Sequence, residues 1–460
     1  MSDLREQLFY EPKNGYDRID TAERVTLERY CEQYMAWLND ARTEREAVRS
    51  AVELAEAQGF RPYTPGMALK AGDKVYQNNR GKALLLAVIG RRPLSEGCVI
   101  AGAHVDSPRL DLKQNPLYET DELCYLKTHY YGGIKKYQWA AIPLELHGVV
   151  ALKDGETVEI TIGRERGEPR FVITDLLPHL AADQMKKTLA EGITGEGLNL
   201  LIGSVPDDDE GKDRVKLAVL SLLNDSYGVT EEDFLSAELV AVPAFDVCEI
   251  GLDRSMIGGY GHDDRVCAFA ELRAILDAEE PERTCVCILA DKEEIGSEGV
   301  TGMQSEAFDT FMADLCESQG TALRRCYERS FCLSADVTAA YDPDFPEAYE
   351  KRNSSRLNYG VGVCKFTGTR GKGGSSDASA ELVGYVRGLF EHAGVVWHLA
   401  ELGKVDQGGG GTIAKFMAKR NIDTIDAGVP VLSMHAPFEV VGKLDCYMTY
   451  KAVLAAYQDR

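Results

Sequence analysis

Apolar positions in the first hundred residues change from a helical spacing to a strand spacing. Over residues 21–40 and 41–60, apolar side chains recur every three to four positions among charged ones, which predicts two amphipathic helices. The runs KALLLAVIG (82–90) and GCVIAGAHVD (97–106) are short and mostly apolar, which predicts two strands. Helices followed by strands favour an architecture in which helices cover a sheet.

The pattern changes between about residues 109 and 246. Short β-rich pieces, such as LELHGVVALKDGETVEITIG (144–163) and PRFVITDLLPHL (169–180), are joined by turns there. The acidic loop PDDDEGKDR (206–214) interrupts them. This region therefore has the character of a separate, β-rich insertion.

Helical and strand patterns alternate again after residue 246. The chain has 460 residues, which is more than one core usually holds, so we expect two domains. The predicted fold class is α/β: residues 1–108 and 247–460 form one discontinuous domain with helices on a mixed sheet. The second domain is the β-rich insertion of residues 109–246.

Composition narrows the classes of partner. The formal net charge of −23 argues against a nucleic-acid surface, which needs clustered Lys and Arg. We find no charge-poor apolar run near the roughly 20 residues of a membrane span, and the start of the chain lacks the regions of a signal peptide. We therefore expect a cytoplasmic protein without nucleic-acid or membrane partners, whose twelve cysteines are reduced and mostly buried.

Polar residues suited to metal binding follow several of the predicted strands. His104 and Asp106 end one strand two positions apart, which places them on the same face of an extended segment. Because ligands bind at the carboxyl ends of strands in an open parallel sheet, distant strand ends can meet in one site. The other candidates stand at strand ends or at the start of a helix: Asp263, Asp264, Glu293, Glu294, Asp336 and His435.

Each candidate also has an ordinary structural interpretation when it is taken alone. A single aspartate before a helical pattern usually caps that helix. A single histidine after a strand is more often a hydrogen-bonded wall residue, and the sequence DKEE (291–294) alone is typical of a solvated acidic turn. Two histidines together with several carboxylates, however, are the ligands that Zn²⁺ or a related divalent ion accepts.

The adjacent acids Glu293 and Glu294 favour the metal interpretation. Two unpaired carboxylates in a partly buried site would repel each other, and one would take up a proton. If one of them binds a divalent ion, the other can take a proton from water that the ion has made more acidic. The pair thus predicts one metal ligand and one general base.

Five ordered segments resemble the motif set of the M18 metalloaminopeptidases, the family that includes aspartyl aminopeptidase. They are AGAHVDSPRLDLK, GYGHDDRVCAFAELR, ADKEEIGSEG, LSADVTAAYDP and LSMHAPFEVVGKLD. Within the insertion, YYGGIKKYQW and LLPHLAAD are also similar to the family. The resemblance implies a phosphorylase/hydrolase-like domain that hydrolyses the amino-terminal residue of peptides. It also implies two divalent ions, usually Zn²⁺, with Co²⁺ or Mn²⁺ as alternatives.

Carried over position by position, the resemblance implies a set of metal ligands. One ion would be bound by His104, Asp263 and Asp336, and the other by Asp263, Glu294 and His435. The family places the bridging aspartate first in its pair, which favours Asp263 over Asp264, although His262 stands where Leu is common.

The resemblance assigns other roles as well. Glu293 would be the general base, and Asp106 would orient His104. The insertion would form the interface of a dimer, and dimers would build a hollow dodecamer. His179 of the insertion would reach into the partner's active site and donate a hydrogen bond to the developing oxyanion.

Substrate preference stays open between neutral and acidic amino-terminal residues. The family's lysine region corresponds here to GTRGKGGSSDA, in which Arg370 or Lys372 could bind a substrate carboxylate or could be solvated loop cations. Two alternative functions also remain. One is a dinuclear aminopeptidase of the M42 type, which is shorter and lacks so large an insertion. The other is a noncatalytic assembly protein with the same fold.

Overall fold

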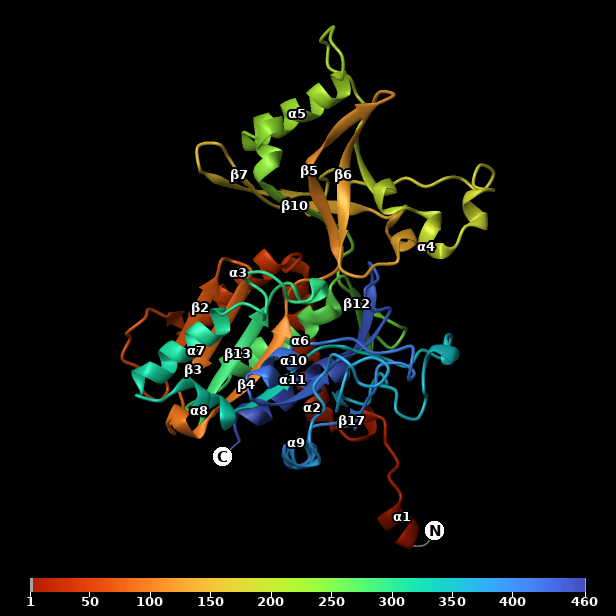
Figure 1. Cartoon of the computed structure of the whole chain (residues 1–460). Coiled ribbons are helices and arrows are strands. Elements are labelled where there is room, and N and C mark those ends of the chain that lie inside the picture. The colour runs from red at the N-terminus through yellow and green to blue at the C-terminus, as the bar shows by residue number, and fades with distance from the viewer. Residues whose placement is uncertain (1–2, 460) are drawn as a thin grey trace.

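A computed structural model of the chain describes residues 3–459. Its named strands form three sheets, of nine, six and five strands. In Figure 1 the six-stranded sheet stands above the nine-stranded sheet and its helices. The short helix α1 (Asp3–Leu8) projects away from the lower part of the molecule.

The nine-stranded sheet is mixed, and three of its central strands are parallel neighbours. β13, β4 and β14 lie side by side in that order, so their carboxyl ends meet at one edge. In sheet order the strands are β1 (Arg61–Pro62), β2 (Lys74–Asn79), β3 (Ala83–Val88), β13 (Thr284–Ala290), β4 (Cys98–His104), β14 (Phe331–Ser334), β18 (Asp423–Gly428), β16 (Val361–Cys364) and β17 (Trp397–Leu399).

Helices cover both faces of this sheet. Successive side chains of each strand point to opposite faces, so apolar strands present apolar side chains to helices on both sides. Val99 of β4 packs in one core with α2, α3, α6, α9 and α11, whereas Ile100 packs in the other with α7, α8 and α10. The helices are α2 (Thr21–Asp40), α3 (Glu44–Ala57), α6 (His262–Leu276), α7 (Ala307–Ser318), α8 (Leu323–Glu328), α9 (Ala380–His392), α10 (Ala414–Lys419) and α11 (Lys443–Tyr457).

The six-stranded sheet is antiparallel and is built from residues 109–243 alone. Its apolar side chains pack with α5 (Arg214–Tyr227) in a core of their own around Trp139. In sheet order the strands are β8 (Thr157–Ile162), β7 (Leu144–Ala151), β10 (Ala237–Pro243), β5 (Arg109–Thr120), β6 (Leu123–Tyr131) and β9 (Asn199–Gly203). The short helix α4 (Leu189–Gly192) lies beside this sheet in Figure 1.

The five-stranded sheet joins segments that are far apart in the sequence. Its strands, in order, are β11 (Cys248–Ile250), β12 (Met256–Gly259), β20 (Glu439–Gly442), β19 (Pro430–Leu432) and β15 (Thr338–Ala339). The turn between β19 and β20 carries His435. The 3₁₀ helices are η1 (Gly15–Asp17), η2 (Leu94–Glu96), η3 (Lys136–Trp139), η4 (Gln184–Lys186), η5 (Gly195–Gly197), η6 (Glu231–Ser236), η7 (Glu293–Ile295) and η8 (Pro346–Ala348).

Most predicted elements are confirmed. The helix predicted over 21–40 is α2, and the helix predicted over 41–60 is α3, which Thr43 caps at its start. In the β-rich piece over 169–180, strand pairing is limited to Phe171 and Val172, which form isolated bridges. The mixed α/β class is confirmed, whereas the domain boundaries at 108/109 and 246/247 remain a prediction.

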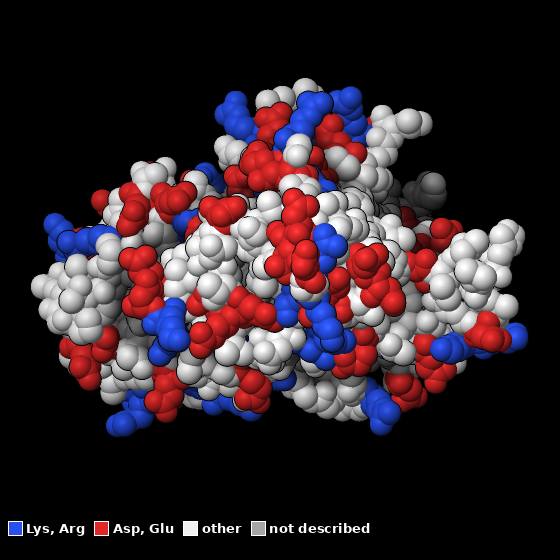
Figure 2. Space-filling model, turned by 90° about the horizontal axis from the view of Figure 1, so that it is seen from above, with Lys and Arg blue, Asp and Glu red and all other residues white. Residues whose placement is uncertain are grey.

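The cysteines are unpaired and mostly buried, as the sequence predicted, and the surface carries charges of both signs. All twelve cysteines are free thiols, and eleven of them are buried. On the face that Figure 2 shows, Lys and Arg side chains are interspersed with Asp and Glu. Within residues 3–459, no helix is long and apolar enough to cross a membrane.

Candidate metal centre

The structure brings the predicted metal-binding residues together at one edge of the nine-stranded sheet. His104 ends β4, Asp336 follows β14 by two residues, and Glu293 and Glu294 lie in η7 just after β13. The parallel order of these three strands explains why their ends converge. Among the described residues, three overlapping groups have ligand atoms within 4.8 Å of one another: His104, Glu293 and Asp336; His104, Asp263 and Glu294; and Asp263, Asp264 and Asp336.

Asp263 lies between the two histidines. Its Oδ1 is 3.3 Å from His104 Nε2, and its Oδ2 is 3.2 Å from His435 Nε2. Although burial raises it, the hydrogen bonds with His104 and His435 lower the pKa of Asp263. Asp263 therefore stays ionised with one oxygen directed to each histidine.

Asp264 is in a different environment, although a cis peptide bond joins it to Asp263. Its Oδ2 accepts a hydrogen bond from the backbone N–H of His104 at 3.2 Å, and its Oδ1 is buried without a hydrogen-bond partner. Burial raises the pKa of Asp264 well above its usual value. The two aspartates therefore differ in position, and Asp263 alone faces both histidines.

Both histidines direct the same ring nitrogen to the carboxylates. His104 Nδ1 lies 2.9 Å from the carbonyl oxygen of Asp106, and His435 Nδ1 lies 2.8 Å from that of Gly133. Because a carbonyl oxygen only accepts hydrogen bonds, Nδ1 carries the proton in each ring. Nε2 is then directed to the cluster, as in a metal-binding histidine.

Asp106 fixes the pair of glutamates as well as His104. Its Oδ1 accepts the backbone N–H of Glu293 at 3.1 Å, and its Oδ2 accepts the backbone N–H of Glu294 at 3.2 Å. The hydroxyl of Tyr131 also donates to Oδ2, at 2.8 Å. Asp106 is 0% exposed, so these bonds form without competition from bulk water.

The two glutamates differ in their distance to the histidines. Glu294 Oε2 lies 3.5 Å from His435 Nε2, whereas Glu293 Oε2 lies 4.0 Å from His104 Nε2. Burial raises the pKa of Glu293 to about 7. Burial, followed by the charge of Asp263, also raises the pKa of Glu294 well above its usual value.

The cluster fits a divalent cation. Buried carboxylates without a nearby positive charge are unfavourable, and Glu294 Oε1 and Asp264 Oδ1 have no hydrogen-bond partner. Although burial lowers it, the hydrogen bond to Asp263 and the charge of Glu294 raise the pKa of His435 to about 10, so the site favours positive charge at Nε2. Imidazole nitrogens and carboxylate oxygens form the donor set of a zinc-type site.

Glu439 also holds this centre together, and sequence reasoning missed it. One oxygen accepts the backbone N–H of His435 at 2.7 Å, and the other accepts the backbone N–H of Asp263 at 3.1 Å. Burial, followed by the charge of Asp263, raises the pKa of Glu439 to about 8. Its position four residues after His435, at the start of β20, is the signal that could have found it.

A cavity of about 420 Å³ opens beside the cluster. Its walls include Asp263, Glu293, the glycines 409–411, Lys415 and Phe416. The loop cations Arg370 and Lys372, considered above for a substrate carboxylate, do not line it. Both are exposed, and Lys372 Nζ lies 3.0 Å from Asp377 Oδ2, so its charge is already neutralised.

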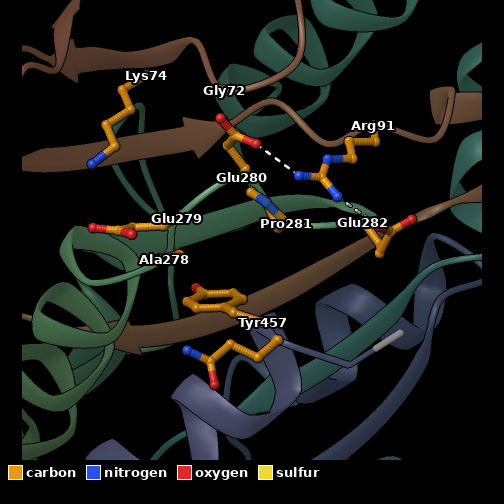
Figure 3. A pocket seen from close by; sticks show the side chains of 10 residues that line it. Gly72, Lys74, Arg91, Ala278, Glu279, Glu280, Pro281, Glu282 and Tyr457 are labelled. Atoms are coloured by element: carbon orange, nitrogen blue, oxygen red, sulfur yellow. Dashed lines mark hydrogen bonds and ion pairs between the residues drawn. The ribbon is translucent and has the colours of Figure 1, made fainter.

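A second cavity, of about 790 Å³, lies elsewhere and lacks the clustered ligands (Figure 3). Arg91 projects into it and pairs with Glu280 at 2.7 Å and Glu282 at 3.3 Å. The charge of Arg91 is therefore already paired within the cavity wall. The cavity beside His104 and Asp263 remains the candidate active site.

The structure leaves His179 outside the centre of its own subunit. The residue is exposed in the loop before η4 and does not line the cavity beside the cluster. Its predicted role requires a second subunit and stays a prediction.

Comparison with known proteins places the chain in a family. Residues 37–457 match the family model described as "Aminopeptidase I zinc metalloprotease (M18)". "Probable M18 family aminopeptidase 1" of Clostridium acetobutylicum is 47% identical over 451 residues, which cover 96% of this chain and 97% of that protein.

Solved structures give the same result. The crystal structure of an M18 family aminopeptidase from Thermotoga maritima has a TM-score of 0.94 and 43% identity, and the match covers 98% of this chain and 100% of that chain. A Saccharomyces cerevisiae protein whose structure is a dodecamer shares the fold, with a TM-score of 0.75, 20% identity, and coverage of 92% and 95%. The chain therefore belongs to the M18 family of metalloaminopeptidases.

Proposed function

We propose that this metalloaminopeptidase removes the amino-terminal residue of peptides at two divalent ions, which share Asp263 as a ligand. The observation that carries the proposal is the position of Asp263 between His104 Nε2 and His435 Nε2, at 3.3 and 3.2 Å. In this proposal His104, Asp263 and Asp336 hold one ion, and Asp263, Glu294 and His435 hold the other. Zn²⁺ is the first choice because the family is described as zinc metalloproteases, with Co²⁺ and Mn²⁺ as alternatives.

The remaining residues divide the chemistry among them. Bound cations would polarise the scissile carbonyl and make a water molecule more acidic. Glu293 would accept the proton of that water and pass it to the leaving amine. Its greater distance from the nearest histidine, 4.0 Å against 3.5 Å for Glu294, supports this division of roles.

Asp106 would keep this arrangement in place. It fixes the ring of His104 through Nδ1 and holds the backbone of both glutamates, which supports its role as the residue that orients His104. The carboxylates that line the cavity would attract the free α-amino group of a peptide, which supports removal of the first residue.

We further propose that residues 1–108 and 247–460 form the catalytic domain, of phosphorylase/hydrolase-like fold, and that residues 109–246 form a dimerisation and lid domain. Exposed apolar side chains gather along the loop around His179, which supports contact with another subunit. They are Leu176, Leu177, Leu180, Met185 and Leu189, which are 50 to 74% exposed. The dodecamer of the yeast protein supports assembly of dimers into a dodecamer here.

His179 would act in the active site of the partner subunit. Its exposure leaves the imidazole free to donate a hydrogen bond across a dimer interface to the developing oxyanion. We also infer a cytoplasmic location, because all twelve cysteines are unpaired thiols, as in a reducing compartment.

The direct test loads chelator-treated protein separately with Zn²⁺, Co²⁺ and Mn²⁺ and measures hydrolysis of a panel of chromogenic aminoacyl substrates. We expect activity only with metal, up to two ions per subunit by elemental analysis, and no cleavage of a peptide with an acetylated amino terminus. Lack of hydrolysis with every metal and substrate would instead support a noncatalytic assembly protein. Cleavage of the acetylated peptide would exclude an aminopeptidase.

A further inference from the structure

Lys415 lies in the wall of the cavity beside the candidate metal centre. Among the described residues that line this cavity it is the only Lys or Arg, and it belongs to α10, outside the predicted ligand set. The other charged walls are chiefly carboxylates, among them Asp263, Glu293 and Asp426. A partly buried ammonium group in such a place requires an explanation.

No carboxylate of the described residues lies within ion-pair distance of the Lys415 ammonium. Its Nζ lies 4.8 Å from the centre of the Phe416 ring, which is a weak contact compared with an ion pair. Lysines of similar or deeper burial do pair, as Lys82 does with Glu238 and Lys443 does with Glu28. The charge of Lys415 is therefore available for a ligand.

Asp426, the acid of this cavity outside the metal cluster, does not neutralise it. Its Oδ1 accepts hydrogen bonds from Thr412 at 2.7 Å and from Ser334 at 2.9 Å. Both donors are neutral hydroxyls, so the hydrogen bonds of Asp426 are formed without the help of Lys415.

The glycines of the loop before α10 leave room for the ammonium group. A Cβ atom at Gly411 would lie 2.8 Å from Lys415 Nζ, so a side chain there would displace it. A Cβ atom at the neighbouring Gly410 would meet nothing within 4 Å, so the loop also leaves open space in the cavity wall. The ammonium is close enough to the cluster that its charge acts on Glu293.

We propose that the Lys415 ammonium binds a carboxylate of the substrate in this cavity and thereby selects peptides that carry one near the scissile bond. This inference rests on the proposed aminopeptidase function. The carboxylate has two possible sources: an acidic side chain on the amino-terminal residue, or the carboxyl terminus of a dipeptide. Because Lys415 lies outside the proposed ligand set, its charge would stay available to a substrate carboxylate while the cluster carboxylates hold the metal ions.

The experiment compares kcat/KM for pairs of substrates that differ in one carboxylate. Peptides that begin with Glu or Gln test the side chain, and a dipeptide with a free or amidated carboxyl terminus tests the other source. In one of these two pairs, the wild-type kcat/KM should be roughly 10- to 100-fold higher for the substrate with the carboxylate than for its neutral counterpart, as expected for a hydrogen bond between charged groups. That pair identifies the carboxylate that Lys415 binds. Lys415→Met should abolish that preference mainly through KM, and Lys415→Arg should retain part of it.

Lys419→Met is the matched control. Lys419 lies on the same helix and over the same Phe416 ring, at 5.5 Å, but it is exposed and does not line the cavity. This variant should keep the wild-type preference. Metal content and thermal melting should be equal in all variants, and Lys415→Arg keeps the test valid if the Met variant does not fold.

The possible results separate the two proposals. If wild-type enzyme cleaves peptides but Lys415→Met leaves both substrate ratios unchanged, the assignment of Lys415 is wrong and the aminopeptidase function stands. If wild-type enzyme with metal cleaves none of the substrates, the proposed function fails, and the selection by Lys415 fails with it.

Discussion

The backbone N–H of Glu293 donates a hydrogen bond to Asp106 Oδ1 at 3.1 Å, so the proposed general base is fixed by the residue that also orients His104. One buried carboxylate thus sets the positions of a base and of a ligand that lie far apart in the sequence. Its chemistry suits this task because an ionised carboxylate offers only acceptors to several converging donors.

Replacement of Asp106 should therefore weaken metal binding although the residue is not a proposed ligand. In Asp106→Asn the amide NH₂ would face backbone N–H donors, and we expect a roughly 10- to 100-fold loss of metal affinity, as is typical for partners of metal-binding histidines. Metal titration of chelator-treated protein checks this. Asp344→Asn, at an exposed loop position, should bind metal as the wild type does, and equal affinity in the two variants would contradict the role of Asp106.

The two glutamates should respond differently to the same change. Glu293→Gln should retain both ions and lower kcat by on the order of 10²-fold or more, because a base transfers a proton but does not hold the ion. Glu294→Gln should lose metal. Elemental analysis together with kcat measures both effects, and near-normal turnover of Glu293→Gln would remove Glu293 from the mechanism.

The adjacent aspartates give a second matched pair. Asp263 faces both histidines, whereas Asp264 accepts a backbone hydrogen bond from His104, so Asp263→Ala should lose more metal than Asp264→Ala. Metal content per subunit after dialysis measures the difference. The reverse order would move the shared ligand to Asp264.

The sequence predicted the candidate metal ligands better than the side chains that hold those ligands in position, such as Glu439. His104 ends an apolar strand, and Glu293 and Asp336 each follow one, so a local pattern in the sequence identifies them. The parallel order of these strands explains why the three residues converge. Glu439 acts through its contacts with the backbone of residues 263 and 435. Its closeness to His435 in sequence was a weak local signal, but its contact with residue 263 is long-range and leaves no local pattern.

The same limit applies to the fold. Helix α2 was predicted because buried Leu27, Tyr34 and Leu38 recur at helical spacing between charged residues. Helix α11 lacks such a pattern, because residues on most of its surface are buried and no polar stripe marks it. The position of Lys415 depends on how the loop before α10 folds over the cavity. The family resemblance instead drew attention to Arg370 and Lys372.

Stability should depend on pH through His147, which is buried between Glu46 at 2.7 Å and Glu145 at 3.2 Å. Although burial lowers it, the close contacts with Glu145 and Glu46 raise the pKa of His147 to about 9, above the roughly 6.5 of an unfolded histidine. The stabilisation of the folded state by protonated His147 is therefore complete below about pH 6.5 and is lost as pH rises through about 9.

We accordingly expect the melting temperature of the metal-loaded protein to fall between pH 6.5 and 9, and to fall less in His147→Gln. His392→Gln, at an exposed position in the last turn of α9, is the control and should behave as the wild type does. An equal decrease in His147→Gln and the wild type would show that other groups cause it.

The last prediction concerns His179, whose exposed side chain lies among apolar residues of the proposed dimer interface. His179→Ala should remain folded, oligomeric and metal-loaded, because the side chain makes no contact with the cluster of its own subunit. Its kcat should nevertheless fall by roughly 10²- to 10³-fold, the usual cost of removing one donor to an oxyanion.

Hybrid dimers with Glu293→Gln decide whether His179 acts across the interface. If it does, each hybrid has one site with both defects and one site with neither. Because half of the dimers in an equal random mixture are hybrids with one intact site, about a quarter of wild-type activity should return. If His179 acted within its own subunit, every hybrid site would carry one defect and mixing would restore nothing. Full activity of His179→Ala alone would leave residues 109–246 with assembly as their only role.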